Sequence, residues 1–233
     1  MIFPALLATS GSLFGISLVE GKGGSSIGVP MQITILMTLL TLLPAAIMSV
    51  TPFLRISIVL HFLRQALGTQ TVPSNQVLVG LSLFLTMLVV SPLFQQIHDQ
   101  AWIPMEQGTL TQSQAIAAAG KPLKAFLSKY AREKDIKLFL EISHSPAPRT
   151  ADDLDLNILI PAYIISELKA GFQIGAVLFL PFLIIDITVA SVTVSVGMMQ
   201  LPPVMLSAPF KILLFVLVDG WNLLVGSLIK SFY

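Results

Sequence analysis

The sequence contains no cysteine, which excludes disulfides, thiolate metal ligands and a cysteine nucleophile. Charge is also scarce, since 11% of the 233 residues are charged whereas a soluble domain has about 25%. Most of the folded surface therefore cannot face water. The net charge is only +1, so the chain has no basic face for binding nucleic acid.

The residues that carry most enzyme chemistry are few and scattered. The three histidines lie in different segments without metal-ligand spacing, and no local motif supplies a serine nucleophile with its base and carboxylate. Three acidic residues are close together at Asp152, Asp153 and Asp155, but a calcium loop would need a glycine and a distal glutamate that are absent. The sequence thus predicts no metal site, no cofactor and no enzyme, and it disfavours an intramembrane enzyme.

What the chain does contain is long apolar segments. Hydrophobic residues make up 55% of it and the mean hydropathy is +0.86. Fifteen of the 25 charged residues fall between Asp99 and Asp155, so the organisation is apolar, then polar, then apolar. Each apolar part holds runs longer than the ~20 residues that a helix needs to cross a bilayer. Arg55 and Arg64, in the short first connection, favour the cytoplasmic side for that end.

These patterns predict an all-α membrane-complex protein of long, proline-interrupted apolar helical hairpins with a small helical polar, periplasmic middle region. We divide it into an N-terminal segment (1–30), a first apolar hairpin (31–97), a polar region (98–157) and a second apolar hairpin (158–233). Within the polar region, helical periodicity runs from Leu123 to Leu140. In the second hairpin, Pro161 and Pro181 predict breaks, and a last helix is expected over 204–229.

The N-terminal segment allows three interpretations. Residues 1–19 are apolar with several small residues, but they lack the positive region that begins a signal peptide. The segment is an unusual signal, a membrane-lying segment, or the start of a trimmed mature chain.

Isolated charges in the apolar segments need partners, because a charge at bilayer depth costs about 2.5–3.5 kcal/mol. Glu167 and Lys169 are two residues apart and do not share a helix face, so Lys211 in the last helix is the natural partner for Glu167. The alternative is that each is solvated separately at an interface. Asp186 and Asp219 have no obvious local partner, and we expect hydrogen bonds to helix termini rather than a proton relay.

A turn over 197–203 separates two apolar helices. Gly197 is suited to end a helix, and the following proline pair blocks its continuation. Met198 and Met199 lie in this turn, and deformable methionines fill irregular gaps. The residues alone favour plain packing, although in a symmetric ring such turns would meet on the axis and seal a passage.

Several long motifs resemble the FliP family of flagellar type III export-gate proteins, whose virulence-secretion relatives share the pattern. Residues 161–175 read PAYIISELKAGFQIG, and PFLIID, GMM, PP, PFK and VDGW follow in order. Upstream, TPFLRI, RQALGT and PSNQV fit too. The resemblance covers roughly 32–233, and the ending FVLVDGW favours the flagellar branch.

The resemblance implies a homopentamer that associates with FliQ-like and FliR-like subunits around a central passage for unfolded flagellar export substrates. FlhB-like and FlhA-like proteins would be further partners. The assembly would belong to the bacterial inner membrane within the flagellar basal body, largely on the periplasmic side. Hydropathy would then overcount spans, because apolar surface is buried against neighbouring subunits.

The resemblance also assigns roles to residues. It implies an inter-subunit salt bridge between Glu167 and Lys211, a role in subunit assembly for Phe126 and Phe139, and a channel gate at Met198, Met199 and Gln200. The chain departs from the family at Gln200, where flagellar relatives often have a third methionine. The rival interpretation, a small-solute or ion transporter, would need pore-lining polar residues and an internal repeat, and the sequence shows neither.

Overall fold

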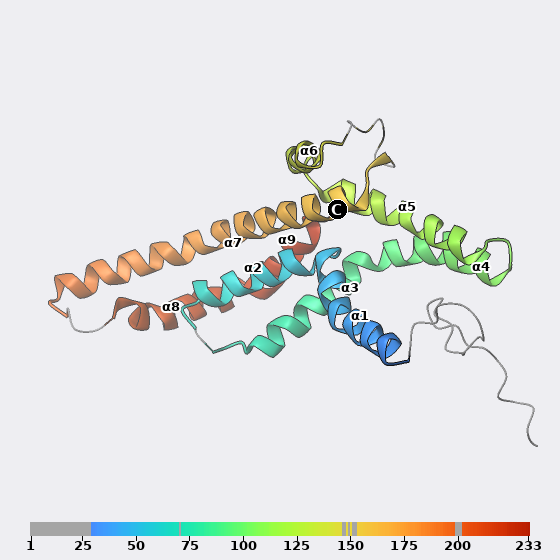
Figure 1. The fold of residues 1–233 in the computed structure, drawn as a ribbon. Coiled ribbons are helices and arrows are strands. Elements are labelled where there is room, and N and C mark those ends of the chain that lie inside the picture. The colour runs from blue at the N-terminus through green and yellow to red at the C-terminus, as the bar shows by residue number, and fades with distance from the viewer. Residues whose placement is uncertain (1–28, 70, 146–147, 149, 151–152, 199–201) are drawn as a thin grey trace, which may run out of the picture. The chain divides into compact units, whose positions relative to one another are not determined.

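The computed structural model describes residues 29–69, 71–145, 148, 150, 153–198 and 202–233 (Figure 1). These residues form helices and no strand, which confirms the predicted all-α fold. The chain divides into two units, Met1–Ile47 and Met48–Tyr233, and each is described by itself. The helices are α1 (Val29–Ser49), α2 (Phe53–Ala66), α3 (Asn75–Ile97), the short π-helix η1 (His98–Trp102), α4 (Ile103–Glu106), α5 (Gln112–Tyr130), α6 (Glu133–Ile142), α7 (Leu156–Ser195), α8 (Pro203–Leu217) and α9 (Gly220–Lys230).

The first unit contains most of α1, an uncharged helix that continues through Pro44. Its threonines do not leave polar groups unpaired in this apolar setting. The hydroxyls of Thr34 and Thr38 each donate to the backbone carbonyl four residues earlier, at 2.8 Å. A polar side chain satisfied by its own helix is compatible with an apolar environment.

In the second unit, α2 packs along the first half of α7. The helices approach closely because α7 presents Gly171 and Gly175 to α2. A Cβ atom added at Gly175 would lie 2.5 Å from the ring of Phe62, and one at Gly171 would lie 3.2 Å from Ile58. Real Cβ atoms do not come as close as the first of these distances, so only glycine fits at position 175 in this packing.

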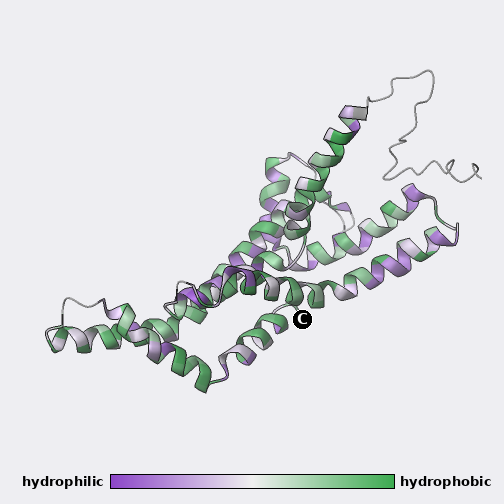
Figure 2. Cartoon of the chain, turned by 90° about the horizontal axis from the view of Figure 1, so that it is seen from below, coloured by the Kyte–Doolittle hydropathy of each residue, from purple (hydrophilic) through white to green (hydrophobic). Residues whose placement is uncertain are grey.

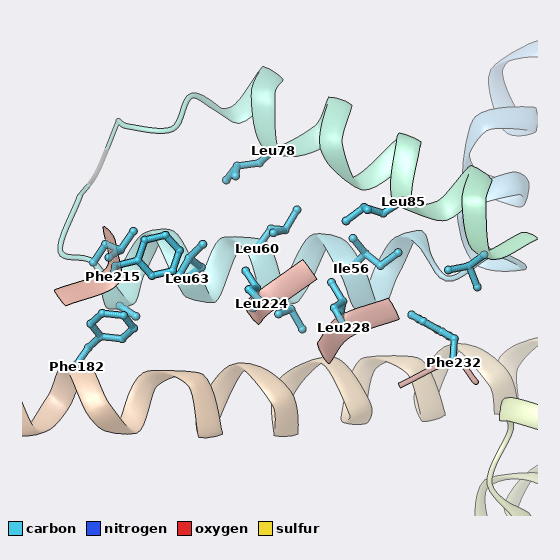
Figure 3. Close-up of a cluster of buried hydrophobic side chains, with 14 residues drawn as sticks. Ile56, Leu60, Leu63, Leu78, Leu85, Phe182, Phe215, Leu224, Leu228 and Phe232 are labelled. Carbon is cyan, nitrogen blue, oxygen red and sulfur yellow. The ribbon is translucent and has the colours of Figure 1, made fainter. Parts of the chain in front are cut away.

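The main hydrophobic core forms around α2, whose apolar residues recur at helical spacing and are buried. Figure 3 shows their side chains meeting those of α3, α7, α8 and α9. The labelled members are Ile56, Leu60, Leu63, Leu78, Leu85, Phe182, Phe215, Leu224, Leu228 and Phe232. Burying each such side chain contributes about 1.5–3 kcal/mol, so this core is what holds the C-terminal helices on α2.

The polar region contains η1, α4, α5 and α6, and a second core joins it to α7. Leu127 and Ala131 pack there with Leu159 and Tyr163. The helical periodicity of residues 123–140 corresponds to two helices and not one, because the backbone becomes extended at Ala131 and Arg132. The Arg132 N–H leaves the helical pattern and donates to Ser166 Oγ of α7 at 2.9 Å.

The 40-residue helix α7 runs without interruption through both of its prolines. The breaks expected at Pro161 and Pro181 are therefore wrong. Each proline removes one backbone donor, and the neighbouring turns keep their hydrogen bonds. At 1.5 Å per residue the helix is about 60 Å long. Most of its buried residues lie between Ile158 and Gly175, whereas the second half is mainly exposed.

The single last helix expected over 204–229 is wrong, because α8 and α9 meet at a bend of 68°. Asp219 adopts a left-handed conformation (φ 52°) and forms the N-cap position of α9. The adjoining Gly220 leaves room for the Phe215 ring, which would lie 2.2 Å from an added Cβ atom. These two residues make the break between the helices.

Three helical stretches of the described chain are long and apolar enough to cross a membrane: Pro30–Ser49, Asn75–Glu106 and Leu156–Ser195. The bent pair α8 and α9 passes the same test when taken together. Figure 2 shows hydrophobic residues along these helices, with hydrophilic residues richest in the hairpin that α4 and α5 form. The apolar stretch Asn75–Glu106 runs past residue 97, where the first hairpin is predicted to end.

Candidate functional site

The most deeply buried ion pair joins α2 to α7. Arg55 Nε donates to Glu167 Oε2 at 2.9 Å, and Arg55 Nη2 donates to the other carboxylate oxygen. Glu167 is fully buried, and the side chain of Arg55 is 8% exposed. Such a two-point pair fixes the guanidinium in the plane of the carboxylate, which gives geometric specificity as well as energy. The pair therefore sets the register between the two helices.

A second ion pair joins α7 to α8. Lys211 Nζ donates to Asp186 Oδ2 at 2.6 Å, and Ser207 Oγ donates to Asp186 Oδ1. Lys211 is 1% exposed, and its Nζ lies 3.9 Å from the point where a Cβ atom of Gly68 would be. The lysine is thus enclosed by α7, α8 and the connection that follows α2.

Glu167 and Lys211 do not pair with each other within one chain. Each already has a partner, Arg55 for the glutamate and Asp186 for the lysine. The expectation that Asp186 bonds to a helix terminus is wrong, since it bonds to two side chains of α8. The predicted pairing of Glu167 with Lys211 between two copies of the chain stays a prediction.

A hydrogen-bonded network connects α6 to α7 beside the first pair. Ser166 Oγ donates to Asp135 Oδ2 at 2.6 Å, and Arg132 Nε donates to the same carboxylate at 2.9 Å. Burial alone would raise the pKa of the Asp135 carboxyl, but these hydrogen bonds and the charges of Arg132 and Lys134 outweigh it and lower the pKa below its ordinary value. The carboxylate is therefore charged at neutral pH and holds the polar region on α7.

The structure describes part of the predicted gating turn. Gly197 ends α7 with φ 80°, and the N–H of Met198 donates to the carbonyl of Thr193 at 3.0 Å. This confirms the predicted helix end at Gly197. Met198 is 42% exposed. Met199 and Gln200 lie outside the described residues.

The two predicted assembly phenylalanines lie on different helices of the polar region. Phe126 of α5 is half-buried, and its ring centroid lies 5.0 Å from that of Tyr130 and 6.3 Å from that of Tyr163. Phe139 of α6 is half-buried as well. Phe126 therefore lies near Glu167, because its ring is next to that of Tyr163, which is one helical turn before Glu167 on α7. A role in assembly stays a prediction for both.

Among the residues that the structure describes, no three His, Asp or Glu side chains are grouped so that they would hold a metal ion. His61 illustrates why. Its Nδ1 lies 2.7 Å from the carbonyl of Ser57, and its Nε2 lies 3.1 Å from Asn75 Oδ1. Both ring nitrogens are therefore engaged: Nδ1 bonds within α2, and Nε2 connects α2 with the start of α3.

Comparison with known proteins gives consistent matches over most of the chain. The FliP family model matches residues 36–228. The flagellar biosynthetic protein FliP of Pectobacterium carotovorum subsp. carotovorum is 48% identical over 212 residues, 91% of this chain and 82% of that protein. The protein of the same name from Bacillus subtilis is 45% identical over 217 residues, 93% and 98% of the two chains. That from Borreliella burgdorferi is 42% identical over 231 residues, 98% and 91%.

Proposed function

The chain belongs to the FliP family, and on that premise we propose that it is the pore-forming core subunit of a flagellar type III protein export gate. The gate would pass unfolded flagellar subunits across the bacterial inner membrane. The relatives are named for flagellar biosynthesis and not for a reaction, in line with a chain that is not an enzyme. The subunit would shape a passage, and energy would come from the rest of the export machine.

The observation that carries this proposal is the uncovered apolar surface of α7. Val177, Leu180, Ile184 and Ile187 are each more than half exposed, and their spacing places them on one side of the helix. A continuous apolar stripe of this kind marks an interaction site. In the proposed gate, neighbouring subunits would cover it.

The proposed assembly is a homopentamer with FliQ-like and FliR-like subunits, held in the flagellar basal body largely on the periplasmic side of the inner membrane. FlhB-like and FlhA-like proteins would adjoin it. The charge arrangement within one chain supports a protein passage over a solute pathway. Glu167 is paired with the buried Arg55 and Lys211 with the partly buried Asp186, so neither is free to line a polar pore.

Co-expression with FliQ-like and FliR-like proteins tests the assembly directly. We expect a closed ring with several copies of this chain, measured by mass and by electron microscopy after purification in detergent. Expression without those partners provides the control for spontaneous association. A monomer or dimer that binds a small solute would overturn the proposal in favour of a transporter.

In the assembled gate, Met198, Met199 and Gln200 would form the seal, with the turns of all copies meeting on the axis. Replacing both methionines with alanine is expected to raise ion conductance through the reconstituted gate several-fold, because shorter side chains leave a constriction that water can fill. Planar-bilayer recording measures this.

The matched control for the seal is Met205→Ala, since Met205 lies outside the turn on α8 and is 75% exposed. It should leave the conductance unchanged. Gln200→Met is expected to lower any leak, because a thioether binds water less well than an amide. Unchanged conductance in the double alanine variant would remove the methionines from the seal.

A further inference from the structure

The last residues of the chain close over the Arg55–Glu167 pair. Arg55 Nη1 lies 3.3 Å from both the carbonyl oxygen and the hydroxyl of Ser231, and donates to them. The guanidinium carbon lies 4.1 Å from the centroid of the Phe232 ring. The residues that follow α9 thus contact a side chain of α2 that is far away in sequence.

The polar region holds Phe232 from another side. Tyr130 of α5 donates its hydroxyl to the carbonyl of Phe232 at 2.7 Å, and the two rings meet edge to face with centroids 5.8 Å apart. Four segments therefore converge on Arg55: α2, which carries it, α7 with Glu167, α5 with Tyr130, and the chain end.

The donor geometry of arginine explains this convergence. A guanidinium has five N–H donors and no acceptor. The Glu167 carboxylate accepts from Nε and Nη2, and the carbonyl and hydroxyl of Ser231 accept from Nη1. One flat face of the guanidinium is covered by the Phe232 ring, and a cation over an aromatic ring is attracted more strongly when water is excluded.

Burial at the chain end changes abruptly from one residue to the next. Phe232 is 2% exposed and belongs to the main core, whereas Tyr233 is 77% exposed. Phe232 is therefore packed against Arg55, whereas the side chain of Tyr233 is exposed. Without Phe232, one face of the ion pair would be open to water and to external cations.

We infer that Ser231 and Phe232 form a C-terminal strap, which closes over the Arg55–Glu167 pair and keeps Glu167 inaccessible from outside its own chain. The strap acts within one chain and goes beyond the proposed function. Its consequence for assembly is that a cation from a second copy reaches Glu167 only after the strap opens.

Carboxyl labelling of the purified full chain in detergent tests the strap. A water-soluble carbodiimide with a glycine amide couples to accessible carboxyl groups, and mass spectrometry measures the rate at each one. In the unchanged chain, we expect Glu167 to label far more slowly than Glu141, which is exposed on α6. Removing residues 231–233 should raise the Glu167 rate at least about tenfold while Glu141 stays unchanged, as for a site released from protection by local structure.

Point variants keep the test decisive if the shortened chain unfolds. Phe232→Ala should raise labelling of Glu167 strongly, and Phe232→Leu should raise it less because an apolar cover remains. Tyr233→Ala is the matched control and should behave like the unchanged chain. Equal Glu167 labelling in Phe232→Ala, Tyr233→Ala and the unchanged chain, with helix content preserved by circular dichroism, would overturn the strap.

Discussion

Replacing Arg55 with alanine is expected to destabilise the chain by about 3–5 kcal/mol, because removing one partner of a buried pair leaves an uncompensated charge. Here that charge is Glu167, which is fully buried. The loss is large against a total stability of about 5–15 kcal/mol for a typical folded domain. Denaturant titration of the purified chain, followed by far-ultraviolet circular dichroism, measures it.

Two companion variants separate the charge from the packing. Adding Glu167→Leu to Arg55→Met removes both charges and is expected to recover most of the stability, because an apolar pair of similar volume replaces the ion pair. Arg55→Lys should recover only part, since a lysine is a point charge that cannot reproduce the two-point contact. If Arg55→Ala unfolds at the same denaturant concentration as the unchanged chain, the pair does not hold α2 on α7.

Variants that exchange charges among Arg55, Glu167 and Lys211 distinguish pairing within a chain from pairing between copies. Exchanging the two charges in Arg55→Glu with Glu167→Arg restores the contact within the chain. Exchanging the charges in Glu167→Lys with Lys211→Glu would restore the predicted contact between copies but would leave Arg55 facing a lysine. Better ring assembly of the second double variant than of either single change would support the inter-subunit pair. Equal or poorer assembly would argue against a direct contact.

Composition and periodicity are enough to predict the helical fold. The prediction depends on local signals: scarcity of charge, runs of apolar residues and the placement of glycine and proline at a turn. Gly197 ends α7 as expected, because a positive φ at a helix end is a property of that one residue.

The errors arose where local signals compete with tertiary packing. Pro161 and Pro181 are predicted to break α7, because an interior proline loses one hydrogen bond and crowds the carbonyl four residues earlier. The helix nevertheless continues through both. Conversely, no proline marks the break between α8 and α9. It depends on Asp219 in a left-handed conformation and on the fit of Gly220 against Phe215, a contact that no periodicity reveals.

The partner of Glu167 was missed for a related reason. Arg55 lies near the start of α2, which made it look like a flanking charge that marks a membrane side. One signal is available, because Arg55 and Glu167 are charges of opposite sign within mainly apolar stretches. Pairing them requires knowing that α2 and α7 pack together, and two residues 112 positions apart give no such information in the sequence.

The second large effect is expected from adding a single methyl group at Gly220, where the chain bends before α9. Gly220→Ala places a Cβ atom 2.2 Å from Cδ2 of the Phe215 ring. That ring cannot withdraw freely, because it packs edge to face on Trp221 with centroids 5.4 Å apart and against Phe182 at 6.5 Å. Overpacking of this kind costs about 1–3 kcal/mol or more, so the melting temperature should fall by several degrees.

Gly226→Ala is the matched control, since it adds the same methyl group to the same helix. Nothing lies within 4 Å of the added Cβ atom, and alanine is favoured over glycine inside a helix by about 1 kcal/mol. Its melting temperature should therefore stay level or rise. Because Gly220 sets the direction of α9, Gly220→Ala should also displace Phe232 from Arg55 and raise Glu167 labelling, whereas Gly226→Ala should not. Equal melting temperatures and labelling rates in the two variants would show that the space beside Phe215 does not determine where the chain end lies.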